Sequence, residues 1–252
     1  MIFQNDFAAG LHVVKDAISS RPVPPLLGGV FMETDGLGNV HLRASDLETT
    51  VECILPATVK AEGAIVLPYE RLLSLITASD KDAVVECRVL EGARVRFNIM
   101  HTVATMHGWA PDKYPPMPTE GDGINWAEVP SAVLNTLVRS VVHAALHNTT
   151  RPVLNGVQIQ WDPDGLVATA ADGFRLASRR DRGVSGTPVT YSALVPRMAA
   201  KYLADLAIQD KAVAAVELGF TRNVLWFKAG RVRATLRLIE GDYPDWQQII
   251  PT

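Results

Sequence analysis

Residues able to bind metal or act as nucleophiles are present, but their spacing assembles no site of a known kind. His143 and His147 stand four residues apart, which would place two imidazoles on one face of a helix. No HExxH glutamate lies between them and no third ligand is suggested. Cys53 and Cys87 lack CxxC spacing, which favours buried, reduced thiols. We therefore predict no metal and no cofactor.

The sequence also contains no recognisable catalytic motif. The stretch "GLGNV" at 36–40 lacks the third glycine of GxGxxG and is typical of a hairpin turn. Asp46 and Asp172 occupy equivalent places in the two halves of the chain, so they do not form one carboxylate pair and are expected to cap strand-end turns. These observations favour a binding protein over an enzyme. A nuclease or nucleotidase built on either aspartate is the enzymatic alternative.

Polar and basic side chains instead recur on the expected helices. The helix over 130–146 has apolar side chains on one face, and a polar stripe on the other that continues past its end: Asn135, Arg139, His143 and His147. The other helices and the loop after the first add Lys15, Arg21, Arg71, Arg197 and Lys201. Similar stripes on several helices suit one phosphate backbone, with salt-sensitive contacts that do not read sequence.

The two halves of the chain present these helices in the same order. Five landmarks recur at an offset of 126 to 130 residues: Arg21-Pro22 and Arg151-Pro152, Gly29 and Gly156, Asp46 and Asp172, Pro68 and Pro196, Tyr114-Pro115 and Tyr243-Pro244. An offset this constant indicates a duplicated domain. We predict an α+β protein of two tandem domains, residues 1–120 and 125–252, with a Pro-, Gly- and acid-rich linker over 117–124.

Each half is expected to fold as two helices packed on about six to eight antiparallel strands. Apolar residues at helical spacing predict helices over 5–19, 68–79, 130–146 and 196–209. Asn5 is the expected N-cap of the first, and Pro68 and Pro196 are expected in the first turn of theirs. Turn signals separate short apolar runs between the helices, which predicts the strands.

Composition is that of an ordinary globular protein: 48% of the 252 residues are hydrophobic and 20% are charged. No secretory signal or membrane span is recognisable, so we expect a cytoplasmic protein that does not bind membranes. The net charge is −3, yet residues 125–252 carry 14 basic and 11 acidic residues. An acidic total therefore leaves room for a locally basic face.

Several stretches resemble a known family. "RPVPPLLGGVFMET", "RPVLNGVQIQ", "ADGFRLA", "LVPRMAAKYL" and "EGDYPDWQQIIP" are similar, in order and spacing, to the bacterial DNA polymerase sliding clamp, the beta subunit of the replicative polymerase. The resemblance covers essentially the whole chain. It implies the DNA clamp fold, with helices lining a ring that slides on duplex DNA, no catalysis, and a location at the nucleoid.

The resemblance also assigns binding residues by position. Arg21, Asn148, Arg151 and Arg197 would face DNA, whereas Glu70 stands where a basic residue is usual. A hydrophobic cleft that takes a short linear peptide of the polymerase or the clamp loader would be formed by Leu154, Gly173, Phe174, Arg175, Leu176, Pro244, Gln248 and Ile249. Phe174 and Gln248 stand where histidine and arginine are common, which suggests a different or more apolar peptide.

Members of the family have three domains per chain and close as dimers, whereas this sequence covers the first two. Two interpretations follow: a two-domain clamp that closes as a trimer of six domains, which we favour because closed rings are the rule, or a truncated member of the dimeric kind. A monomeric, clamp-derived adaptor or decoy that binds peptides without holding DNA is the alternative function.

Overall fold

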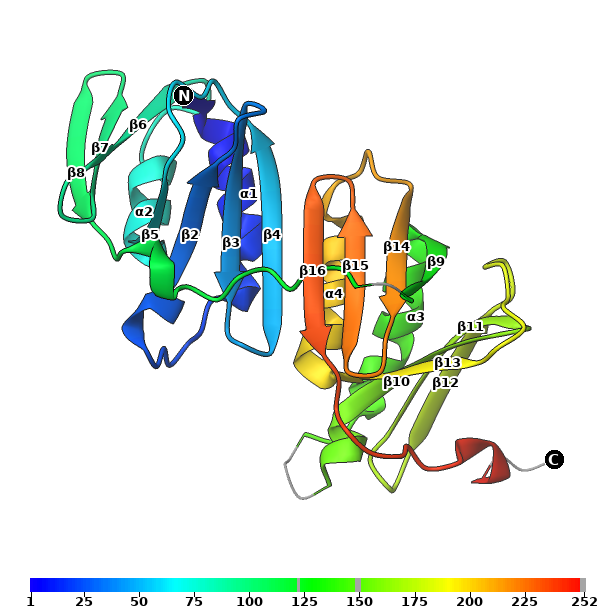
Figure 1. Cartoon of the computed structure of the whole chain (residues 1–252). Coiled ribbons are helices and arrows are strands. Elements are labelled where there is room, and N and C mark those ends of the chain that lie inside the picture. Colours follow the sequence, from blue (N-terminus) through cyan, green and yellow to red (C-terminus); the bar gives the residue numbers. More distant parts are fainter. Residues whose placement is uncertain (122, 148–150, 250–252) are drawn as a thin grey trace. The chain divides into compact units, whose positions relative to one another are not determined.

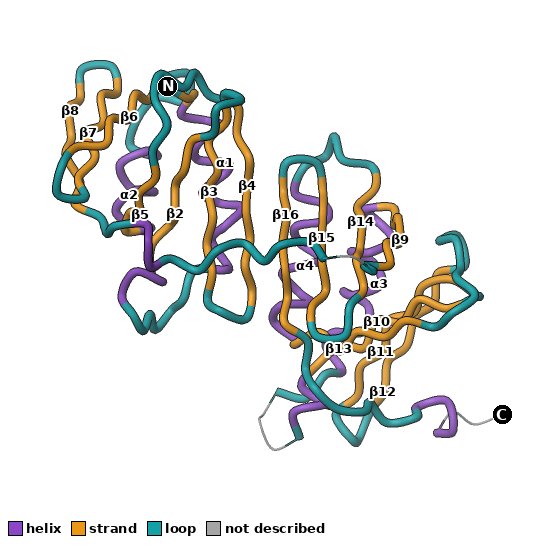
Figure 2. Tube along the Cα trace, viewed as in Figure 1, coloured by secondary structure: helices purple, strands orange, loops and turns teal. Residues whose placement is uncertain are grey.

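The computed structural model describes residues 1–121, 123–147 and 151–249. The chain forms two compact units. Unit 1 comprises Met1–Pro118 and Arg231–Arg233, and unit 2 comprises Thr119–Gly230 and Ala234–Thr252. Each unit contains two α-helices and short strands, which is the predicted α+β class (Figures 1 and 2).

Unit 1 contains two four-stranded groups and a pair of helices. Strands β1 (Ile2–Phe3), β6 (Val84–Leu90), β7 (Arg94–Ile99) and β8 (Thr102–His107) pair in that order. Strands β5 (Ala64–Pro68), β2 (Gly29–Thr34), β3 (Asn39–Ser45) and β4 (Thr49–Pro56) form the second group. Helices α1 (Gln4–Val14) and α2 (Tyr69–Thr77) bury Phe7, Leu11, Leu72 and Ile76.

Unit 2 repeats this arrangement. Strands β12 (Leu176–Asp181), β11 (Gly165–Ala171), β10 (Gly156–Asp162) and β13 (Tyr191–Pro196) form one group. Strands β16 (Val232–Arg237), β15 (Val224–Ala229), β14 (Ala215–Phe220) and β9 (Asn125–Pro130) form the other. Helices α3 (Ser131–Val141) and α4 (Arg197–Gln209) lie behind β14–β16 in the view of Figure 1.

The helix starts differ in detail from the predictions. Phe3, not Asn5, is the N-cap of α1, because β1 runs directly into the helix and leaves no separate capping turn. Pro68 and Pro196 are N-caps, not first-turn residues, with extended ψ angles of 118° and 139°. Pro130 has the same place before α3. A residue before the first turn donates no helical hydrogen bond, so proline is tolerated there.

The predicted turn residues make the expected hydrogen bonds. The Asp35 carboxylate accepts hydrogen bonds from the backbone of Leu37 and Asn39 in the β2–β3 turn, at 3.0 and 2.8 Å. Gly38 has a φ of +85°, which glycine adopts without strain. Asp46 accepts from the backbone of Glu48 and Thr49, which confirms its predicted capping role.

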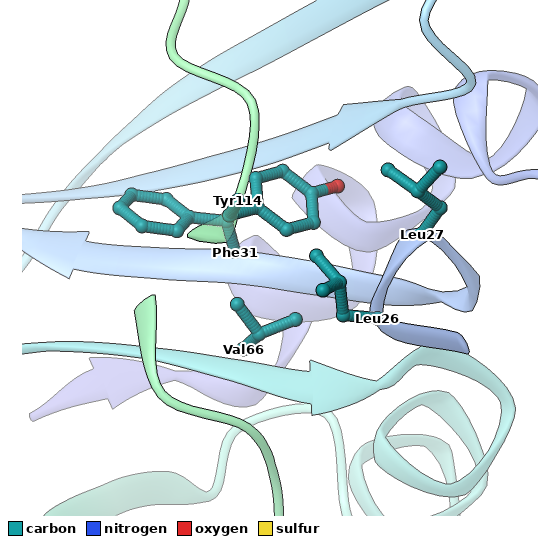
Figure 3. Close-up of a cluster of buried hydrophobic side chains, with 5 residues drawn as sticks. All are labelled: Leu26, Leu27, Phe31, Val66 and Tyr114. Carbon is teal, nitrogen blue, oxygen red and sulfur yellow. The ribbon is translucent and has the colours of Figure 1, made fainter. Parts of the chain in front are cut away.

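The tyrosine of the first Tyr-Pro turn is a core residue of unit 1. Tyr114 packs with Leu26, Leu27, Phe31 and Val66, gathered from separate segments in Figure 3. Its ring stacks on Phe31 at 5.4 Å between centroids. The hydroxyl donates to the carbonyl of Gly29 and accepts from the backbone N–H of Ser45, both at 3.1 Å. Burial raises the pKa of Tyr114 to about 12.

The duplication is visible in the strand registers. Gly29 of β2 pairs with Pro68 of β5, and Gly156 of β10 pairs with Pro196 of β13. Ile2 of β1 pairs with Val85 of β6, and Val129 of β9 pairs with Val216 of β14. Equivalent positions of the two units can therefore be matched residue by residue. None of the helices in the described part of the chain has the length and hydropathy to cross a membrane.

Candidate nucleic-acid interface and partner-peptide surface

The polar stripe predicted on the third helix faces the fourth. The side-chain amide of Asn135 donates to the carbonyl of Ala204 on α4 at 2.8 Å. Arg139 forms an ion pair with Asp205 on α4, and both side chains stay well exposed. These two members of the stripe therefore hold α3 against α4, and Arg139 keeps an exposed surface beside its carboxylate partner.

The histidines do not extend this stripe. Helix α3 ends at Val141, His143 lies in a 3₁₀ turn over Val142–Ala144, and Ala145 is extended. The predicted helix to residue 146 was therefore too long, because the chain leaves helical geometry two turns after Asn135. His147 follows in a loop, and Asn148 lies outside the described residues.

Helix α4 carries the predicted basic pair of unit 2. Arg197 is half-buried at the first position of α4, and its Nε donates to the carbonyl of Val142 at 3.4 Å. Lys201 lies one turn later and is exposed. Arg197 thereby links the start of α4 to the end of α3, and Lys201 is the freer cation for an outside partner.

In unit 1 the predicted cations are dispersed. Lys15 lies in a 3₁₀ turn that follows α1, Arg21 in the loop beyond it, and Arg71 in the first turn of α2. All three are exposed, and Glu70 is exposed beside Arg71. Together, helices α1 to α4 carry four basic and three acidic side chains, a net charge of +1. The four helices, taken together, are therefore only weakly basic.

The predicted peptide surface is organised around a turn between β11 and β12. The Asp172 carboxylate accepts hydrogen bonds from the backbone of Phe174 and Arg175, each at 3.0 Å, which confirms its predicted role as a capped strand-end turn. These hydrogen bonds lower the pKa of Asp172. Gly173 has a φ of +92°, and Phe174 is fully exposed. The turn therefore holds an aromatic ring out in solvent.

Arg175 and Leu154 connect this turn to the end of α3. The Arg175 guanidinium bonds the Asp172 carboxylate at 2.9 Å and donates to the carbonyl of His143 at 2.9 Å. Leu154, in a 3₁₀ turn over Pro152–Asn155, is buried and accepts a backbone hydrogen bond from Leu146. The structure thus brings Leu154, Arg175 and the loop after α3 together, and Leu176 lies half-buried at the start of β12.

Arg151 lies beside this turn. Its Nη1 atom is 3.9 Å from the position that a Cβ on Gly173 would occupy. A residue predicted to face DNA therefore adjoins a residue predicted to contact peptide. Sequence alone gave no signal for this proximity, because 22 residues separate the two positions along the chain.

The segment after β16 supplies the remaining predicted peptide residues. Tyr243 is partly buried, and burial raises its pKa to about 12, as it does for Tyr114. Pro244 is exposed, and the exposed side chain of Gln248 donates to the Asp245 carboxylate at 2.8 Å. Ile249 is the last residue of a 3₁₀ turn over Trp246–Ile249. Asp205 is the residue that the sequence prediction missed, although it stands four positions after Lys201 on α4.

Comparison with known proteins identifies the family. A model of the DNA polymerase III beta subunit, N-terminal domain, matches residues 1–118, and one of its central domain matches residues 128–245. The beta sliding clamp of Synechocystis sp. is 30% identical over 266 residues, which cover 98% of this chain and 68% of that protein. The chain belongs to the beta sliding clamp family.

Solved clamp structures share the fold. The DNA polymerase sliding clamp of Bacillus subtilis superposes with a TM-score of 0.92 at 25% identity, over 99% of this chain and 67% of that one. A Pseudomonas aeruginosa sliding clamp bound to griselimycin gives a TM-score of 0.89 at 21% identity, over 100% and 67%. This member of the clamp family therefore spans about two thirds of the length of its relatives and has the α+β clamp fold.

Proposed function

We propose that this chain is a DNA sliding clamp, a processivity factor that encircles duplex DNA and tethers a polymerase to it. The observation that carries the proposal is the pair of helices found in each unit. Helices α1 to α4 together have a net charge of +1, whereas the whole chain has a net charge of −3. Phosphates attract such a surface weakly and without reading sequence. Weak contact suits a protein that moves along DNA while ring closure retains it. We expect it to act in the cytoplasm, at the nucleoid.

The proposed DNA contacts are the cations on and next to the helices. The cations are Lys15, Arg21, Arg71, Arg139, Arg151, Arg197 and Lys201, and Asn148, with a neutral amide side chain, is the eighth proposed contact. Glu70 and Asp205 reduce the field of Arg71 and Arg139, so we expect single substitutions to have small effects and combined ones to be additive. Arg151 adjoins Gly173 and is the member of this set that could serve either surface.

Retention on circular DNA tests the proposal. A ring loaded onto a nicked circular plasmid by a bacterial clamp loader should stay bound through gel filtration and leave once the plasmid is linearised. The triple variant Arg21→Ala, Arg139→Ala, Arg197→Ala should load less or leave sooner. A matched control replaces Arg88, Arg94 and Arg96, exposed arginines of β6 and β7. Equal retention on circular and linear DNA would contradict a sliding ring.

We further propose that Leu154, Gly173 to Leu176, Pro244, Gln248 and Ile249 form a peptide-binding surface in unit 2. Aromatic side chains are enriched at the cores of protein interfaces, and Phe174 offers a fully exposed ring to a partner. The expected partners are short linear peptides of the replicative polymerase and the clamp loader. Griselimycin, which a P. aeruginosa clamp binds, is a suitable probe ligand.

Ring closure requires self-association. Strand β8 lies at the edge of the β1-β6-β7-β8 sheet, where one row of backbone groups can pair with another chain. Six domains of this size correspond to three copies of this chain, so we favour a trimer over a dimer. Light scattering over a range of concentrations tests this, and a mass near three times 27.4 kDa supports the trimer. A monomer that still binds griselimycin would favour the adaptor or decoy function.

A further inference from the structure

Unit 1 contains a cavity that no part of the proposed clamp function uses. Its volume is about 490 Å³, within the range of small-molecule sites. The floor is buried and apolar, formed by Ile2, Phe7, Met32, Val40 and Ile65. The mouth is formed by the exposed loop that connects β4 to β5 and by β6.

Unit 2 fills the corresponding place with three aromatic rings. Trp161 stacks on Tyr191 at 5.7 Å and on Phe220 at 6.1 Å between ring centroids, and we call these three residues the aromatic stack. The indole N–H of Trp161 donates to the carbonyl of Ser185 at 2.7 Å, in the loop that connects β12 to β13.

The strand registers show which residues of unit 1 stand in the same positions. Trp161 and Tyr191 pair five residues beyond the Gly156–Pro196 pair, and five residues beyond the Gly29–Pro68 pair are Thr34 and Gly63. Phe220 lies four residues after Val216, and Val89 lies four residues after its counterpart Val85. The aromatic stack therefore corresponds to Thr34, Gly63 and Val89.

All three of these smaller residues line the cavity. A Cβ added to Gly63 would meet only Val89 Cγ2, at 3.9 Å, so the space continues up to the backbone. One repeat thus supplies aromatic rings from its own chain where the other leaves an open volume. A cavity of about 150 Å³ already accommodates benzene, so the unit 1 cavity is large enough for a bicyclic ring.

A weak polar contact joins the two sides of the cavity mouth. Lys60, from the β4–β5 loop, lies 3.7 Å from Glu86 of β6; the lysine side chain is largely exposed and the glutamate side chain is partly exposed. An exposed pair of this kind contributes little to stability and gives way readily. The Thr34 hydroxyl accepts a hydrogen bond from the backbone of Gly63 at 2.9 Å, which fixes the loop end beside the cavity.

We propose that the unit 1 cavity is a binding site for a planar, largely apolar aromatic group of indole size, which occupies the positions that the aromatic stack fills in unit 2. The group is either a free heterocycle or an aromatic side chain of a peptide. Its ring would lie against Met32 and Ile65, and an N–H donor would face the carbonyls of the β4–β5 loop, as Trp161 faces Ser185.

Methyl NMR of the full chain with labelled methionines tests the site. Indole should shift the Met32 resonance in a saturable manner and leave Met198, an exposed residue of α4, unchanged. Gly63→Ala should keep this response. Gly63→Tyr, which restores one ring of the aromatic stack, should weaken binding by at least about tenfold. Val89→Phe is a second filling variant, should Gly63→Tyr unfold.

The outcomes distinguish binding of a peptide side chain, binding of a free heterocycle and the absence of a binding site. A Met32 shift with N-acetyl-L-tryptophanamide as well as indole supports a peptide side chain, whereas a shift with indole alone supports a free heterocycle. No saturable Met32 shift with either probe overturns the proposal. The proposal is also overturned if indole shifts the Met32 resonance equally in the wild type and in folded Gly63→Tyr or Val89→Phe protein.

Discussion

Arg139 of α3 and Asp205 of α4 form an ion pair on the helices proposed to face DNA. The pair joins the two helices of unit 2 through side chains that remain exposed. Because the carboxylate lies next to the guanidinium, a phosphate approaching Arg139 meets a largely neutralised group. The packing of α3 on α4 therefore itself weakens the positive electrostatic potential around Arg139.

Removing the carboxylate should strengthen DNA binding. We expect Asp205→Asn to slow dissociation from circular DNA, and to steepen the dependence of log K on log salt concentration by up to about 0.9 for one added phosphate contact. Dissociation rates across a salt series measure this. The control is Asp164→Asn, an equal charge change in the β10–β11 turn. Equal effects of both variants would mean that only net charge matters.

A second prediction concerns the Tyr114 hydroxyl. Tyr114→Phe leaves the buried N–H of Ser45 without its partner, so the free energy of unfolding should fall by about 1–3 kcal/mol. Urea unfolding measures the change. Tyr69→Phe is the matched control, because the hydroxyl of this buried tyrosine has no hydrogen-bond partner among the described residues. A similar loss in both variants would contradict the role given to the hydrogen bonds.

Much of the fold follows from local signals in the sequence. The duplication, the hairpin turn at Gly38 and the strand-end aspartates depend on residues close together in the chain, and the structure agrees with them. The predicted end of α3 and the predicted N-cap of α1 were wrong, because β1 runs directly into α1 and a 3₁₀ turn follows α3 at Val142. The Arg139–Asp205 pair and the aromatic stack join strands or helices that are far apart along the sequence, so no local sequence pattern predicts them.

The exposed ring of Phe174 leads to a third prediction. Phe174→Ala should leave unfolding unchanged, because the side chain is fully exposed. It should weaken griselimycin binding by about 1 kcal/mol or more if the ring contacts the ligand. Isothermal titration calorimetry measures both affinity and stoichiometry. Leu37→Ala removes a comparably exposed apolar side chain from a turn of unit 1 and should have no effect. Unchanged affinity in Phe174→Ala would remove this residue from the peptide surface.

A fourth prediction concerns acid stability. The two Arg180 Nη atoms hydrogen-bond the Asp162 carboxylate at 2.5 and 2.8 Å, which lowers the pKa of Asp162. A lowered pKa gives stability that is present above the unfolded value of about 3.9 and is lost as pH falls through the folded value. Arg180→Met should therefore reduce the difference in unfolding free energy between pH 5 and pH 3. Arg179→Met, which removes the neighbouring arginine of β12, should preserve it.

The two cysteines give the last prediction. Burial raises the pKa of both the Cys53 and the Cys87 thiol to about 12. Only the thiolate attacks a disulfide reagent, and a thiol with a pKa raised this far is almost entirely protonated at pH 8. Ellman's reagent should therefore react slowly with the folded protein and rapidly in urea. Between pH 8 and pH 10 the native rate should keep rising, whereas an ordinary thiol levels off above about 8.5. Two rapidly titrating thiols at pH 8 would contradict this, and Cys53→Ser and Cys87→Ser would identify the reactive one.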